Sequence, residues 1–423
     1  MLFQVYGENA LFQWGGLIAV LLVLMLLNWY SIKSKRGAII MLIAVPAVVT
    51  AYCIAVAVGA ASGAEWALQS PTNLYMNGWF HYAKLYAALL SCISFLLIRF
   101  QWGIGKKKWF VYTVPGILIL NILIAVISDV EHAVGAWYTW ELSSEGVWLY
   151  GGWHNVMNAI AGILCIVGLT AVMHIYVSKP LGKDGGRDVI WADMTWVWII
   201  PYDLWNFAYT YNNLPTHSWY CGVALLLAPT ILAFVWNRGS WLINRGHTLT
   251  FWCMFAQVFP LFMEQAPFSV LPTMYADGVM TNGAVNVVPM TVVSALALVS
   301  NLALVAAAVY RSRTLKKNWW KHEMFTSTKD YREALERAEF HRLRERSARD
   351  RCRAESCEGI APAAVSRTRK MPPFGAASLL NGALCGTKRR ATRRALQPKT
   401  KSPSSSKKSI SPRWMMPFRF RVT

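Results

Sequence analysis

Charged residues are scarce in this sequence. Asp, Glu, Lys and Arg make up 15% of the 423 residues, whereas about a quarter is usual in soluble domains. The scarcity is greatest in residues 1–310, which contain only 13 Lys and Arg and 12 Asp and Glu. Hydrophobic residues make up 55% of the chain. This composition argues against a soluble enzyme and predicts an integral membrane protein.

Signatures of several enzyme classes are also absent. The chain contains no GxGxxG, Walker loop, HExxH or nucleophile elbow. We therefore expect no cofactor and no metal, and an enzyme is the less favoured class. A hydrolytic metal site built from His81, His154, Asp203 and Glu264 is an alternative, but their spacing does not require one.

Long apolar runs are abundant. Nine of them reach the roughly 20 helical residues that cross a hydrocarbon core about 30 Å thick. None alternates with period two, as the strands of a membrane barrel do, so each is expected to be a helix. We predict an all-α, polytopic membrane helix bundle with nine spans, at about 11–30, 38–60, 80–101, 110–128, 153–178, 189–211, 220–237, 249–268 and 286–310.

Basic residues follow alternate spans. They occur at 33–36 and 106–108, in the loop that contains Arg238 and Arg245, and in the long C-terminal region. The intervening loops contain no Lys or Arg but do contain acidic residues such as Asp129. Because loops rich in Lys and Arg stay in the cytoplasm, this pattern predicts an outside N-terminus and a cytoplasmic C-terminus.

The composition changes after about residue 310. Residues 311–423 contain 29 Lys and Arg and 9 Asp and Glu. After a transmembrane domain at 1–310, we predict a basic juxtamembrane segment and cytoplasmic helix at 311–350, and a basic, Ser/Pro-rich, disordered tail at 351–423. The basic residues and tryptophans of 311–321 suit the anionic lipids of the inner leaflet.

Two interpretations of the end of the chain stay open. A basic arm binds polyanions weakly, but this one has few aromatic residues for stacking on bases, so we expect no specific nucleic-acid partner. Alternatively, residues 345–423 have no selected function and are an out-of-frame or read-through extension, because they contain no motif and no repeat.

Polar residues inside the predicted spans are the candidates for function, because unpaired charge in a bilayer is costly. Helical spacing places them on shared faces in the outer half of the membrane. We therefore predict a hydrated cavity around Asp203 that opens outward. The candidate ligand-binding residues are Asp203, Asn206, Lys84, His81, His154, Asn155, Asn158, Gln257 and Glu264.

This cavity favours a secondary transporter or a solute-binding membrane protein, since no ATP-binding motif occurs. Asp203 would bind a cation or proton, and the asparagines would bind a small polar solute. Three alternatives stay open. These are an intramembrane enzyme that acts on a lipid through His81 or His154 with Asp203, a sensory or scaffold protein that uses the helix at 327–350, and polar side chains that serve only as hydrogen bonds between helices.

Five segments carry a family resemblance: WFHYAKLYAALLSCISFLLIRF, IWADMTWVWIIPYDLWNFAYTYNN, HSWYCGVALLLAPTI, HTLTFWCMF and FTSTKDYREAL. They are similar to an uncharacterised family of bacterial multi-spanning membrane proteins, a domain of unknown function. The resemblance covers about residues 1–340 and implies a multi-pass protein of the bacterial inner membrane. It implies no substrate, activity or site residue.

Overall fold

The computed structural model describes residues 2–143, 148–178, 180, 184–275 and 283–338. The predicted tail at 351–423 and the end of the predicted cytoplasmic helix lie outside these residues. All the described residues belong to one compact unit. Apart from two small two-stranded sheets, its regular elements are helices.

Five helical segments are long and apolar enough to cross a membrane. On the first two of these segments, at residues 10–33 and 35–61, apolar side chains such as Leu22 and Val48 are exposed on the bundle surface, as expected of side chains that face lipid. The prediction of an all-α bundle with membrane-spanning helices is confirmed. The segments are α1 (Ala10–Lys33), the continuous α2, η1 and α3 (Lys35–Ile39, Ile40–Ala44 and Val45–Ala61), α6 (Trp79–Phe100), η3 with α7 (Lys108–Tyr112 and Thr113–Gly135) and α13 (Val287–Leu315).

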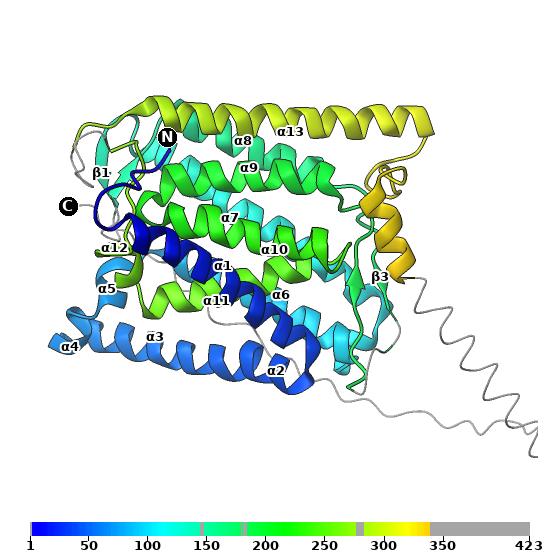
Figure 1. Ribbon diagram of the computed structural model, residues 1–423, viewed down its shortest axis with the longest axis horizontal. Coiled ribbons are helices and arrows are strands. Elements are labelled where there is room, and N and C mark those ends of the chain that lie inside the picture. The colour runs from blue at the N-terminus through cyan, green and yellow to red at the C-terminus, as the bar shows by residue number, and fades with distance from the viewer. Residues whose placement is uncertain (1, 144–147, 179, 181–183, 276–282, 339–423) are drawn as a thin grey trace, which may run out of the picture. The chain divides into compact units, whose positions relative to one another are not determined.

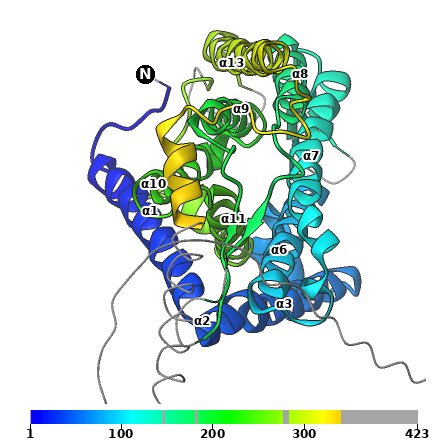
Figure 2. The same cartoon turned by 90° about the vertical axis from the view of Figure 1, so that its right-hand side faces the viewer.

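Four shorter or more polar helical segments complete the described bundle. They are α8 (Trp153–Val167), α9 (Trp196–Asn213), η5 with α10 (Trp219–Ala224 and Leu225–Val235) and α11 (Trp241–Val258). In the end-on view, α9 and α11 lie at the centre, surrounded by the long apolar helices (Figure 2). Each predicted span overlaps one of these nine segments, while the number of membrane crossings and their orientation stay predictions.

Three predicted spans differ from the helices in their ends. The helix α8 ends at Val167 instead of near residue 178, and α9 begins at Trp196 instead of near 189. Between them the chain forms β3 (Tyr176–Val177) and β4 (Val189–Ile190), an antiparallel pair whose apolar residues look like helix in a hydropathy profile. The helix α11 occupies 241–258 instead of 249–268, because Pro260, which lacks an N–H, follows its end.

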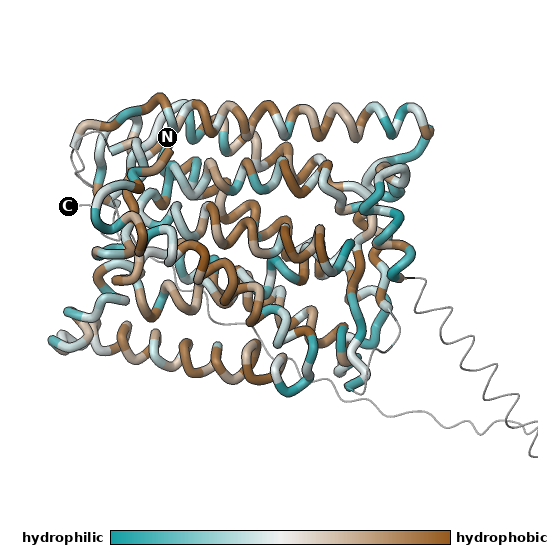
Figure 3. Tube along the Cα trace, in the orientation of Figure 1, coloured by the Kyte–Doolittle hydropathy of each residue, from teal (hydrophilic) through white to brown (hydrophobic). Residues whose placement is uncertain are grey.

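Short elements cover the two ends of the bundle (Figure 1). Hydrophobic residues dominate the middle of the long helices, and hydrophilic residues gather at the ends (Figure 3). The end near the N-terminus carries α4 (Glu65–Leu68), α5 (Pro71–Tyr75), β1 (Trp140–Leu142), β2 (Trp148–Tyr150), η4 (Pro215–His217) and α12 (Leu261–Glu264). The opposite end carries η2 (Gly103–Lys106), β3, β4 and a helical stretch at 329–338.

The helical stretch 329–338 is fixed to the bundle by packing and by charge. Tyr331 and Ala334 pack on Ile190 of β4. Asp188, in the connection between α8 and α9, forms ion pairs with Arg99 at 2.8 Å and with Arg337. Burial alone would raise the pKa of Asp188, but the charges of the two arginines outweigh it and hold this pKa below its usual range. The described start of the predicted cytoplasmic helix, residues 329–338, therefore packs against the bundle.

Gly162 of α8 marks a close approach of three helices, and a side chain there should destabilise the bundle. A Cβ atom at this position would lie 2.6 Å from Val126 Cγ2 and 2.8 Å from Trp205 Nε1. We expect Gly162→Ala to cost about 1–3 kcal/mol of stability, as overpacked cores do, and to lower the unfolding temperature in detergent. At Gly116, on an exposed side of α7, the space is open, so Gly116→Ala is the matched control. Equal effects of the two variants would contradict the packing.

Asp188→Asn should destabilise the protein at neutral pH, because two arginines would lose their buried partner, at a cost of about 3 kcal/mol. Since the folded pKa of Asp188 is depressed, its contribution is complete above the unfolded pKa of about 4. That contribution is lost as the pH falls through the folded value. The gap in unfolding temperature between wild type and Asp188→Asn should therefore narrow below about pH 4. The control is Asp184→Asn, at an exposed position in the same connection; a gap that is independent of pH would contradict the ion pairs.

Candidate functional site

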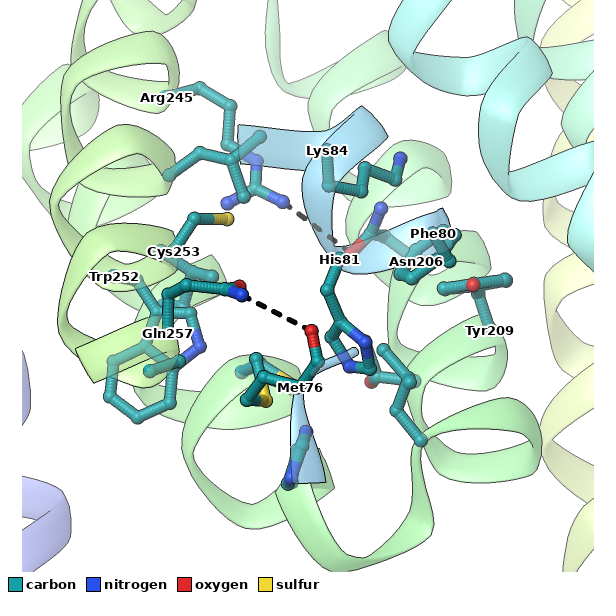
Figure 4. A pocket seen from close by; sticks show the side chains of 17 residues that line it. Met76, Phe80, His81, Lys84, Asn206, Tyr209, Arg245, Trp252, Cys253 and Gln257 are labelled. Carbon is teal, nitrogen blue, oxygen red and sulfur yellow. Dashed lines mark hydrogen bonds between the residues drawn. The ribbon is translucent and has the colours of Figure 1, made fainter. Parts of the chain in front are cut away.

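A cavity of about 70 Å³ lies inside the bundle, lined by residues of α6, α9, η5, α10 and α11. We call it the chamber (Figure 4). One water molecule needs about 10–15 Å³ of such volume, so the chamber has room for several waters or a small solute. Two cationic side chains, Lys84 of α6 and Arg245 of α11, are among its lining residues.

Arg245 is the buried cation of the chamber, with only 4% of its surface exposed. Its Nε donates to the hydroxyl of Tyr202 at 3.2 Å, and its Nη2 donates to Asn206 Oδ1 at 3.5 Å. The buried Nη1 has no hydrogen-bond partner in the described part of the chain. Arg245 was predicted to lie in a cytoplasmic loop, and that prediction is wrong, because α11 begins at Trp241 and includes it.

Lys84 is half-buried and turns its ammonium group toward α7 (Figure 4). Its Nζ donates to the main-chain oxygen of Asn121 at 2.6 Å. The same atom lies 5.5 Å and 5.9 Å from the ring centres of Phe80 and Tyr209, which is the range of cation–π contacts. Among the described residues, no carboxylate lies within 4 Å of the charged nitrogens of Lys84 or Arg245.

Asp203 is not among the chamber's lining residues, although the sequence predicts a cavity around it. One oxygen of its carboxylate accepts a hydrogen bond from Thr230 of α10 at 2.8 Å. The other oxygen is buried without a partner in the described residues. The lining of the chamber therefore includes Arg245 and Asn206, and Asn206 lies one turn along α9 from Asp203.

The structure brings four of the nine candidate residues together at the chamber. These are Lys84, Asn206, His81 and Gln257. Both ring nitrogens of His81 are buried without a partner among the described residues. The Gln257 amide donates to the main-chain oxygen of Met76 at 3.1 Å, which closes one wall (Figure 4).

A second cavity, of about 410 Å³, lies toward the end of the bundle near the N-terminus, and we call it the vestibule. His81, Leu214 and His217 line both the chamber and the vestibule. Glu264, another of the candidates, belongs to the vestibule, where it pairs with His217 at 2.6 Å. The three shared residues therefore lie between the two cavities.

The remaining candidates, Asn155, Asn158 and His154 of α8, lie away from the chamber lining. The two asparagines, with Asn213 of α9, donate hydrogen bonds to Asp129 at 3.2, 2.8 and 2.8 Å. Asp129 was predicted in an outer loop, but it is fully buried inside α7. Three amide groups replace water around its carboxylate and join α7, α8 and α9 at one point.

In the described part of the chain, neither His81 nor His154 is hydrogen-bonded to Asp203. The ring of His154 stacks on Tyr150, His81 lines the chamber, and Asp203 binds Thr230. Within the described residues, no group of three or more His, Cys, Asp or Glu side chains could hold a metal ion.

A family model described as a family of unknown function, DUF5692, matches residues 7–337. The chain belongs to the DUF5692 family. The resemblance of the five sequence segments to a domain of unknown function is thereby confirmed, while the bacterial and multi-spanning character of the family stays a prediction. No curated protein and no solved structure matches the chain. The DUF5692 match includes every chamber residue and ends next to Ala338, the last described residue of the helical stretch 329–338.

Asp129→Asn should destabilise this DUF5692 protein. The new side chain replaces one carboxylate oxygen with an NH₂ group, so one of the three asparagine N–H donors would face another donor instead of an acceptor. Each buried donor left without an acceptor costs about 1–3 kcal/mol. We expect a lower unfolding temperature in detergent, by several degrees. Glu131→Gln on the same helix is the control. In the wild type the Trp79 indole N–H donates to the Glu131 carboxylate at 3.1 Å, and the side-chain carbonyl of a glutamine can still accept this hydrogen bond. If Asp129→Asn were as stable as Glu131→Gln, the cluster would not fix the three helices.

Proposed function

We propose that this DUF5692 protein binds a small anionic solute in the chamber and is a secondary transporter or channel for it. The observation that supports this most directly is the state of Arg245. Its guanidinium is buried beside a cavity, with one nitrogen unpartnered and no carboxylate within ion-pair distance among the described residues. Lys84 adds a second positive charge to the same lining.

A buried charge without a partner is costly, and an anion at Arg245 removes much of that cost. Inside a protein the attraction between opposite charges is stronger than in water, because the local dielectric constant is lower. The planar guanidinium also matches the two oxygens of a carboxylate or a similar group. Tyr202 and Asn206 hold the guanidinium in place before a ligand arrives. An anion would therefore enter a site that is already organised.

This proposal reverses the charge of the ligand expected from the sequence. A cation or proton was expected at Asp203, whose carboxylate lies outside the chamber lining and receives the Thr230 hydroxyl. The groups that line the chamber are positive or neutral instead. Asn206 keeps its predicted place in the site, but its oxygen now accepts from Arg245.

We further propose that all nine helical segments cross the bacterial inner membrane, with the N-terminus outside. In this orientation the vestibule faces the outside, and a solute reaches the chamber past His81, Leu214 and His217. The basic segment 311–321 would then lie at the inner leaflet, next to anionic lipids. The helical stretch 329–338 would cover the cytoplasmic end of the bundle.

Thermal unfolding of the purified full chain in detergent, with a panel of small anions and cations, tests the anion site. We expect at least one anion to raise the unfolding temperature by several degrees, since a ligand at 100 times its Kd stabilises by about 2.7 kcal/mol. The shift should disappear in Arg245→Met and weaken in Lys84→Met. Arg36→Met, at an exposed position of α2, is the matched control and should keep the full shift.

Two results would overturn the anion site. One is a shift that persists in both Arg245→Met and Lys84→Met. The other is stabilisation by cations alone that disappears in Asp203→Asn, which would return the site to the carboxylate. Arg245→Lys separates charge from shape, because it keeps the charge and removes the planar fork.

A further inference from the structure

We infer that the ligand of the chamber is a short-chain aliphatic monocarboxylate, a single carboxylate on a small apolar body, in preference to an inorganic oxyanion such as sulfate or phosphate. This inference rests on the anion site proposed above and names its class of ligand. It is carried by the apolar walls of the chamber and by its volume.

Several donors around the chamber are already engaged. The Thr210 hydroxyl donates to the main-chain oxygen of Phe207 at 3.0 Å, and the Tyr209 hydroxyl donates to Ser128 at 3.1 Å. The Gln257 amide is engaged by Met76. The donors left free include Arg245 Nη1, the remaining protons of the Lys84 ammonium, the Asn206 amide and a ring N–H of His81. This set admits a small anion of either kind, so the choice between a carboxylate and an oxyanion depends on the walls of the chamber.

The rest of the chamber is lined mainly by apolar side chains. Leu249 lies one turn from Arg245 on α11, and Leu225, Trp252 and Cys253 complete this wall. Arg245 approaches the chamber from one end, and Met76 and His81 approach from the other (Figure 4). A ligand whose charge contacts Arg245 would therefore place the remainder of its body against apolar surface. An inorganic oxyanion would lose its hydration at these walls and gain no contact in return.

The volume sets an upper limit on the apolar body. A cavity of about 150 Å³ is needed to hold a benzene molecule, and the chamber has about 70 Å³. An aromatic acid is therefore too large, unless its ring extends past His81 into the vestibule. Acetate, with four non-hydrogen atoms, is the best fit to the chamber itself. Butyrate has six, as many as benzene, so the end of its chain, which is narrower than a ring, would extend past His81 toward the vestibule.

The test is calorimetric titration of the full chain in lipid nanodiscs with acetate, propionate, butyrate, benzoate, sulfate and phosphate. We expect the Kd to fall about fourfold for each added methylene from acetate to butyrate, since each buried methylene contributes about 0.8 kcal/mol. Benzoate, sulfate and phosphate should bind at least tenfold more weakly than butyrate. Butyramide, which has the same chain without the charge, should show no binding.

Two variants separate the apolar wall from the charge. In Leu249→Thr the Kd should depend less on the chain length of the carboxylate. The Kd for acetate should stay within about twofold of the wild-type value. Leu227→Thr, at an exposed position of α10, should leave the whole series unchanged.

The outcomes distinguish failure of this inference from failure of the anion site. Tight sulfate or phosphate binding that is lost in Arg245→Met, with weak butyrate binding, would keep the anion site and overturn the carboxylate. If the Kd were the same for acetate, propionate and butyrate, the ligand would not use the apolar walls. That result would overturn this inference and keep the anion site. Equal binding of butyrate and butyramide, or no binding of any anion, would overturn both.

Discussion

A guanidinium inside a helix bundle has to be held by groups other than water, and the interior of this protein is arranged around that constraint. Arg245 is held by a hydroxyl and an amide of α9. The helix α9 is in turn fixed to α7 and α8, through Asn213 at Asp129 and through the indole of Trp205 at the main-chain oxygen of Asn158. The chamber thus lies inside the bundle, among α6, α9, α10 and α11.

Asp129 and Arg245, two of the interior charged groups, differ in how many partners they have. Asp129 has three amide donors within hydrogen-bond distance, which leaves its carboxylate little capacity to accept another partner. Arg245 keeps a nitrogen without a partner in the described residues, and a cavity lies next to it. By this criterion Asp129 is a structural group, and Arg245 is the group with capacity left for a ligand.

The long apolar runs made the helical fold predictable, because crossing a hydrocarbon core needs both length and hydrophobicity. Lys84, His81, Asn206 and Gln257 were also found, because each is a polar residue inside an apolar run. Arg245 and Asp129 were assigned to loops, since a hydropathy profile treats charge near the end of a run as a sign of water. The partners that allow these two residues to be buried come from other helices, far away in the sequence, and no local pattern contains them.

The helix α6 has a part in both the chamber and the far end of the bundle. Lys84 lies near its start, and Arg99 in its last turn pairs with Asp188, which also pairs with Arg337. At a rise of about 1.5 Å per residue, roughly 22 Å of continuous helix joins the two side chains. A rod of this length moves as one body. A displacement of the helical stretch 329–338 that pulled on Asp188 would therefore act, through α6, on the position of a cation at the chamber.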